Sequence, residues 1–122
     1  MNTQIEAYES ERPLKQHEDE MMEHILSRFG NSCFTLLDIG CADGTFIEAA
    51  AKRMEKANFV GIDISQKLIE VAKSKQVKSA KFITEDGLKY ETEAKFDVIV
   101  CSGILSIFEC YKDPLTKWLD LL

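Results

Sequence analysis

The segment from Leu36 to Phe46 constrains the fold more than any other part of the chain. Apolar residues from Cys33 onward lead into it, which is typical of a buried strand, and apolar residues at helical spacing follow it. Between them lies a turn that contains Gly40 and Gly44. Glycines allow a sharp turn and let a ligand approach the backbone, while the start of a helix offers unpaired N–H groups. The segment therefore predicts a strand, a turn and a helix that together form a ligand site.

Strand and helix patterns alternate along most of the chain. We expect strands at 33–39, 58–62, 81–84 and 96–101, and helices at 14–29, from the turn to about residue 54, after Ser65 as an N-cap, and from Asp113-Pro114 to the end. Such alternation predicts an α/β protein with a doubly wound parallel sheet and helices on both faces.

An acidic residue stands at the end of each of the first three expected strands: Asp38, Asp63 and Asp86. Ligands of parallel sheets bind beyond the carboxyl ends of the strands, near the point where the strand order reverses. Each acid alone could instead cap a loop or a helix. Their joint placement beside a glycine turn favours a binding site.

Composition excludes several classes of protein. A formal net charge of -6 disfavours nucleic acid, because most affinity for phosphates comes from Lys and Arg. No apolar run approaches the roughly 20 residues that span a bilayer, and the N-terminus lacks the apolar core of a signal peptide, so we expect a cytoplasmic protein without a membrane partner. The four cysteines form no CxxC pair, and the HExxH-like stretch at His17 lacks its second histidine. We therefore expect reduced thiols and no metal site.

Two kinds of nucleotide site compete for the turn. The dinucleotide fingerprint GxGxxG, started at Gly40, would need glycine at positions 42 and 45, where Ala42 and Thr45 stand. In addition, Asp43 would repel a pyrophosphate at the helix start. A nicotinamide-dependent oxidoreductase is therefore the least favoured of the functions considered.

The turn instead resembles the first motif of the class I S-adenosylmethionine-dependent methyltransferases, in the form D-x-G-C-x-x-G from Asp38. Asp63 lies in a segment similar to the second motif, Glu85-Asp86-Gly87 resembles the third, and Phe96 to Gly103 resembles the fourth. The resemblance implies a Rossmann-like sheet that binds S-adenosyl-L-methionine and releases S-adenosyl-L-homocysteine.

The resemblance also implies roles for individual residues. The position of Asp38 faces the amino-acid portion of the cofactor, Asp63 accepts hydrogen bonds from the ribose hydroxyls, and Asp86 accepts one from the adenine amino group. Leu88 and Ile64 would flank the adenine, and Ala42 replaces a commoner glycine, which is tolerable if its φ is negative. The candidate cofactor residues are Asp38, Gly40, Cys41, Ala42, Gly44, Asp63, Ile64, Asp86, Gly87, Cys101 and Ser102.

The acceptor half of the site is less defined. No residue stands out as a catalytic base, and we expect positioning to supply much of the catalysis. The segment after Cys101 is similar to those of family members that act on small molecules, so a small-molecule acceptor is favoured over nucleic acid. The apolar residues of that segment would wall an acceptor pocket or serve core packing, with neither role preferred: Ile104, Leu105, Ile107 and Phe108.

We divide the chain into an N-terminal helical segment, 1–30, in which Tyr8 is a candidate lid residue, and a cofactor-binding α/β portion, 31–122. The family's sheet continues beyond this point, so the resemblance predicts a fold truncated before its last strands. A bare sheet edge tends to pair with another chain, which predicts self-association. The second functional hypothesis is a module that binds the cofactor without performing catalysis.

Overall fold

The computed structural model describes residue 14 and residues 16–101 of the 122-residue chain. Its elements are α2 (Gln16–Phe29), β1 (Thr35–Ile39), α3 (Thr45–Arg53), β2 (Asn58–Asp63), α4 (Gln66–Ser74), β3 (Ala80–Thr84) and β4 (Val98–Val100). The expected helix from Asp113, with the rest of 102–122, lies outside the described residues.

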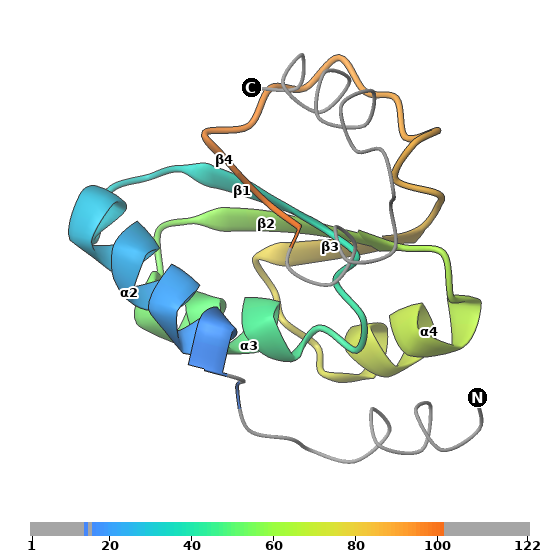
Figure 1. Cartoon of the computed structure of the whole chain (residues 1–122), viewed down its shortest axis with the longest axis horizontal. Coiled ribbons are helices and arrows are strands. Elements are labelled where there is room, and N and C mark those ends of the chain that lie inside the picture. Colours follow the sequence, from blue (N-terminus) through green and yellow to red (C-terminus); the bar gives the residue numbers. More distant parts are fainter. Residues whose placement is uncertain (1–13, 15, 102–122) are drawn as a thin grey trace.

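The four strands form one parallel sheet in the order β3-β2-β1-β4 (Figure 1). The chain moves from β1 outward to β2 and β3, and then returns to place β4 on the other side of β1. The order therefore reverses between β1 and β4. This arrangement confirms the α/β class and the parallel, Rossmann-like sheet, and it puts the carboxyl ends of all four strands at the same edge.

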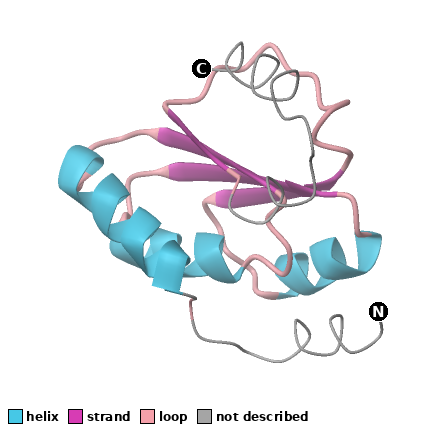
Figure 2. Cartoon of the chain, in the orientation of Figure 1, coloured by secondary structure: helices cyan, strands magenta, loops and turns pink. Residues whose placement is uncertain are grey.

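The described helices all lie on one face of the sheet, as Figure 2 shows. They pack against side chains of that face through one apolar cluster, which includes Met22, Phe46, Phe59, Ile69 and Phe82. A second cluster on the opposite face joins strand residues to Tyr90 and Phe96, which belong to the segment between β3 and β4. Within the described residues, that segment covers the second face, so a helix on this face remains a prediction.

Local sequence explains where the helices begin and end. Gly30 takes φ +53° and its N–H donates to the carbonyl of Leu26 at 2.9 Å, so α2 ends at Phe29, the end expected from the sequence. Ser65 caps α4 as expected, since its hydroxyl accepts a hydrogen bond from the N–H of Leu68 at 3.2 Å. The N-cap of α3 is Gly44, whose φ of +80° a residue with a side chain rarely adopts.

The first strand begins at Thr35, two residues later than expected. The backbone N–H of Thr35 donates to the carboxylate of Asp97, the residue before β4, at 2.9 Å. At this position a side chain, and not a strand carbonyl, accepts the hydrogen bond. The fourth strand is also shorter than expected, at Val98–Val100. Its Val98 and Ile99 are only partly buried in the structure.

Glu18 differs from the other acids of α2, which are exposed, because it is only 5% exposed. It lies four residues before Met22 on the buried face of the helix, and a carboxylate in the first turn is favoured by the helix dipole. His17 and His24 are exposed, as the pattern indicated. Among the described residues, no helix is long and apolar enough to cross a membrane.

Candidate functional site

The bend after β1 lies directly against the end of β2. The backbone N–H groups of Gly40 and Cys41 both donate to the carbonyl of Ile62, at 2.8 and 3.0 Å. Gly40 takes φ +81°, which only glycine adopts without strain, so it supplies the sharp change of direction. The glycine turn that the sequence predicted is therefore attached to the strand that carries Asp63.

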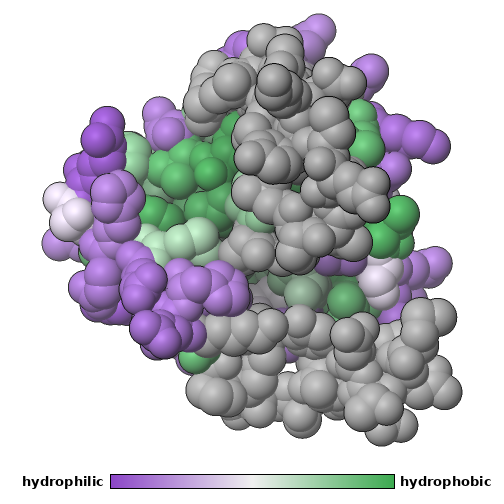
Figure 3. Space-filling view, in the orientation of Figure 1, coloured by the Kyte–Doolittle hydropathy of each residue, from purple (hydrophilic) through white to green (hydrophobic). Residues whose placement is uncertain are grey.

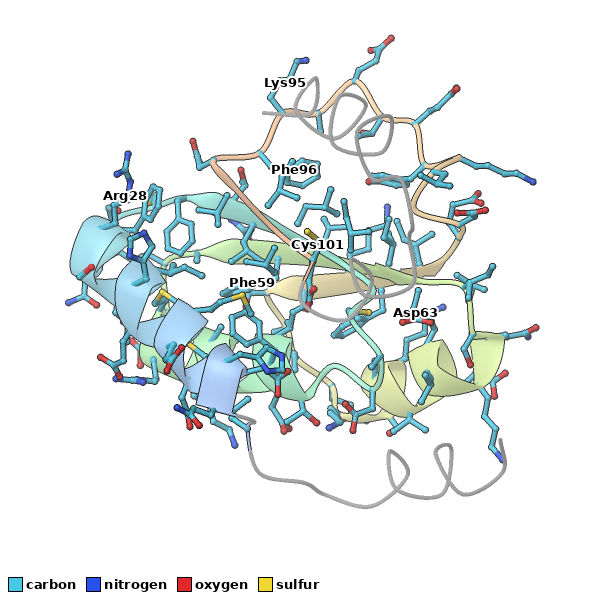
Figure 4. All side chains as sticks on the ribbon, viewed as in Figure 1. Arg28, Phe59, Asp63, Lys95, Phe96 and Cys101 are labelled. Atoms are coloured by element: carbon cyan, nitrogen blue, oxygen red, sulfur yellow. The ribbon has the colours of Figure 1, made fainter. Side chains whose placement is uncertain are left out.

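Asp63 connects three segments through its carboxylate. Its Oδ2 accepts a hydrogen bond from the N–H of Ala42 and its Oδ1 accepts one from the N–H of Ser65, both at 2.9 Å. Its side chain lies at the end of β2, beside the start of α4 (Figure 4). A carboxylate has about four lone-pair sites, so each oxygen retains capacity for a further donor.

Ala42 has φ +52°, which contradicts the expectation of a negative φ at this position. The left-handed conformation costs a residue with a Cβ about 1–2 kcal/mol. In this conformation its N–H is bonded to Asp63. The bend is thus formed by three consecutive contacts with β2, at Gly40, Cys41 and Ala42.

Asp38 is 3% exposed and lies at the core of the predicted site. Burial first, and the charge of Asp38 second, raise the pKa of the Cys41 thiol far above its usual range. The same two causes, in the same order, raise the pKa of Cys101, which follows β4 (Figure 4). Asp38, Cys41 and Cys101 are therefore close together, and both thiols stay protonated at neutral pH.

Asp86 lies in a turn that is connected to the end of β2. The N–H of Glu85 donates to the carbonyl of Asp63 at 2.9 Å, and the carboxylate of Asp86 accepts from the N–H of Leu88 at 2.9 Å. Asp86 therefore caps its own loop, which was the alternative to a role in ligand binding. Its side chain is only partly buried. Gly87 lies in this turn and is also partly buried.

Two apolar side chains next to these acids are exposed. Ile64 is 74% exposed and Leu88 is 37% exposed, and they stand out among the large apolar residues, most of which are buried. They are the residues that the resemblance places beside an adenine ring. The structure thus brings together the predicted residues from 38 to 87, with Cys101 beside Asp38; Ser102 lies outside the described residues.

Sequence reasoning missed one residue that shapes this region. Gly61 in β2 sits where a Cβ would lie 2.8 Å from Cδ1 of Ile47 and 2.9 Å from both Sγ of Cys41 and Cδ1 of Phe82. Only glycine lets α3 and the bend approach the strand so closely. A glycine inside an apolar strand is the signal that could have identified it.

A separate groove of about 600 Å³ runs between α2 and β4. Its lining is mainly apolar and reaches Cys101 at one end, with His17, Glu20 and His24 contributed by the helix. Figure 3 shows apolar side chains gathered beside the hydrophilic outer face of α2 in this view. The groove adjoins the predicted cofactor site at Cys101.

Comparison with curated proteins finds several methyltransferases and a carboxy-S-adenosyl-L-methionine synthase among the relatives. Over 74 residues, 60% of this chain, the sequence is 35% identical to malonyl-[acyl-carrier protein] O-methyltransferase of Bacillus anthracis. Over 97 residues, 76% of this chain, it is 37% identical to carboxy-S-adenosyl-L-methionine synthase of Nautilia profundicola. The chain covers 28% and 41% of these two proteins, so it spans well under half of their length.

Among solved structures, the chain resembles the plantazolicin methyltransferase BpumL in complex with SAH. The TM-score is 0.74 at 29% identity, and the match covers 86% of this chain and 41% of that chain.

A family model described as a methyltransferase domain matches residues 31–117, which is more than half of the chain. The match includes β1 to β4 and every predicted cofactor residue. On this evidence, the chain belongs to the class I S-adenosylmethionine-dependent methyltransferase family.

Proposed function

We propose that this chain binds S-adenosyl-L-methionine at the carboxyl ends of β1, β2 and β3 and takes part in methyl transfer to a small molecule. The observation that carries the proposal is the hydrogen bond between Ala42 and Asp63. It fixes the bend, which would contact the amino-acid portion and the ribose, beside the carboxylate that would bind the ribose hydroxyls.

The charge of the site fits this cofactor better than a dinucleotide. Asp38 and Asp63 bring negative charge to adjoining strand ends, and Asp43 is fully buried in the bend. S-adenosylmethionine has an ammonium and a sulfonium cation and carries no phosphate, whereas a pyrophosphate would be repelled here. The donors and acceptors present therefore match the proposed ligand.

Different residues would contact different parts of the cofactor. Each carboxylate oxygen of Asp63 has a lone pair left for a ribose hydroxyl, and the exposed side chains of Ile64 and Leu88 offer apolar contact to adenine. Asp86 would accept a hydrogen bond from the adenine amino group. The N–H of Leu88 occupies one lone pair of its Oδ1, and the other lone pairs of the carboxylate could accept this bond. Asp38 would face the amino-acid portion.

When bound, the cofactor supplies a methyl group that its sulfonium already activates. The chain's contribution is then to hold and orient, and such positioning lowers the barrier by removing the entropy of a bimolecular encounter. Burial first, and the charge of Asp38 second, raise the pKa of Cys101, so this side chain would meet the cofactor as a neutral thiol. We assign no residue as a catalytic base.

The small-molecule acceptor is favoured by the net charge of -6, which disfavours nucleic acid. The relatives named above support it, since one methylates a malonyl group and another is named for plantazolicin. The test is to supply methyl-labelled cofactor with separated metabolite, RNA and protein fractions. Label in the metabolite fraction alone is expected; label in RNA alone would contradict the proposal.

The second candidate is a module that binds the cofactor without catalysing transfer. A methyl-transfer assay on this chain beside a version extended to the length of those relatives separates the two. Binding by both with transfer only by the longer version would establish the binding module.

Cofactor binding itself is tested by calorimetric titration with S-adenosylhomocysteine and, separately, with NADH. We expect saturable binding of the first and none of the second; the reverse would identify the site as a dinucleotide site. We further propose a cytoplasmic location and an N-terminal lid that includes Tyr8. The helix α2 is itself packed into the core through Met22 and Ile25, so such a lid would be formed by the residues before it.

A further inference from the structure

Asp43 is a buried charge inside the bend that the proposed function leaves without a role. It is 0% exposed, and its Oδ1 accepts hydrogen bonds from the N–H of Thr45 at 3.1 Å and from the hydroxyl of Thr45 at 2.8 Å. These two contacts fold the chain between Gly40 and the first turn of α3. The conformation of the bend therefore depends on where this carboxylate lies.

Lys75 brings a positive charge to the same place from another helix. It is the C-cap of α4, and its Nζ lies 3.7 Å from Oδ2 of Asp43 and 4.0 Å from Oε1 of Glu48. The same Nζ donates a hydrogen bond to the hydroxyl of Thr45 at 3.2 Å. The side chain of Lys75 is only 14% exposed, so the ammonium is largely withdrawn from water.

A buried carboxylate costs free energy unless a charge or hydrogen bonds compensate it. Removing one member of a buried ion pair is strongly destabilising, whereas replacing both members with uncharged groups is often tolerated. Without Lys75, the carboxylate of Asp43 would lower its free energy by moving toward water, and this movement would shift the bend. Lys75 therefore opposes a rearrangement of the segment that would contact the cofactor.

The bend is then fixed from two sides. On one side, Ala42 is hydrogen-bonded to Asp63. On the other side, Gly44 lies so close to α4 and β3 that a Cβ there would be 3.0 Å from the Cβ of Ala72. Lys75 adds an electrostatic contact to this second side, between the end of α4 and the start of α3.

We propose that Lys75 is a positioning residue for the cofactor site, which acts by holding Asp43 and Thr45 and does not touch the cofactor. The inference rests on the proposed function, because its effect is read as cofactor affinity. Lys75 lies at the end of α4, and none of the predicted cofactor residues comes from this helix end.

The test uses Lys75→Met in the 122-residue chain, with Lys73→Met as the matched control. Lys73 lies in the last turn of the same helix and is exposed, so its replacement removes the same charge near the same helix end. We expect Lys75→Met to raise the Kd for S-adenosylhomocysteine about tenfold and Lys73→Met to leave it within about twofold.

The double variant Asp43→Asn, Lys75→Met distinguishes positioning from a general loss of stability. Asparagine retains an oxygen for the N–H of Thr45 and leaves no buried charge, so we expect the Kd to return to within about threefold of wild type. Thermal unfolding of each variant without ligand is measured alongside. A lower melting temperature for Lys75→Met with an unchanged Kd would overturn the proposal.

Should Lys75→Met fail to fold, Lys75→Gln is the variant to measure, because glutamine keeps a polar group at this position but lacks the charge that compensates Asp43. A wild-type Kd in Lys75→Gln would overturn the positioning role and leave the proposed function intact. Absence of binding by the wild-type chain would overturn both. The two failures are therefore distinguishable.

Discussion

The backbone N–H of Ala42 donates to Oδ2 of Asp63 at 2.9 Å across 21 residues of sequence. This bond joins the bend after β1 to the end of β2, the two parts of the chain that the proposed cofactor would contact together. Ala42 makes this bond while it is in the left-handed conformation, with φ +52°.

The strain at Ala42 predicts that Ala42→Gly stabilises the chain. Glycine takes a positive φ without steric cost, and after its greater loss of entropy on folding we expect a gain of about 0.5–1 kcal/mol. Urea unfolding measures it. The control is Ala51→Gly inside α3, where the same change should lose about 0.5–1 kcal/mol. A loss at both positions would contradict the role given to Ala42.

Gly44 is expected to tolerate no side chain. A Cβ there would meet Ala72 at 3.0 Å and Phe82 at 3.1 Å, in a backbone with φ +80°. We expect Gly44→Ala to lower the free energy of unfolding by about 2–4 kcal/mol, from strain and overpacking together.

Gly30→Ala separates the two causes. Gly30 also has a positive φ, of +53°, but a Cβ there would be in ordinary van der Waals contact, 3.8 Å from the carbonyl oxygen of Leu26. Its cost should be about 1–2 kcal/mol. Equal losses in Gly30→Ala and Gly44→Ala would show that packing at Gly44 contributes nothing.

The raised pKa of Cys41 predicts a loss of stability in alkaline solution. In the folded chain, burial and then Asp38 keep this thiol neutral, whereas in the unfolded chain it ionises above about pH 8.5. The unfolded state therefore binds fewer protons than the folded state above that pH, and stability falls as pH rises.

The slope from this one thiol approaches about 1.4 kcal/mol per pH unit. Denaturant unfolding from pH 7 to 10 measures it, with Cys41→Ala as the comparison. The variant should be less stable at pH 7 and show a shallower decline. Parallel curves for the two proteins would mean that Cys41 is not the group responsible.

The position of β4 predicts self-association. Within the described residues, β4 ends the strand order and has β1 as its neighbour on one side. An apolar strand with an unpaired edge tends to pair with another chain. Light scattering should show a mass that rises with protein concentration, and a strict monomer at high concentration would count against this prediction.

Much of the architecture could be predicted because its signals are local. The glycine turn at 40–44, the cap at Ser65 and the stop at Gly30 each depend on residues within a few positions, and the structure places them as expected. The alternation of strand and helix patterns predicted the parallel sheet. Once strands are parallel, their carboxyl ends meet at one edge, which brings Asp38 and Asp63 together.

The rest depends on contacts between residues far apart in sequence. The bend that contains Ala42 is bonded to Asp63, and buried Asp43 is paired with Lys75, whose Nζ bonds a hydroxyl 30 residues away. At the start of β1, the N–H of Thr35 is bonded to Asp97, 62 residues away. No spacing rule within the turn itself indicates these partners.

The central claim is that the carboxylate of Asp63 and the bend it holds form one cofactor site. Calorimetric titration of wild type, Asp63→Ala and Asp97→Ala with S-adenosylhomocysteine tests it most directly. Asp97 is the control, because its carboxylate also accepts a backbone N–H but lies at the amino-terminal ends of the strands, away from the predicted site. We predict that Asp63→Ala weakens binding by about 1.5–3 kcal/mol, tenfold or more in Kd, while Asp97→Ala binds as wild type does. Equal affinity of all three proteins would contradict the account.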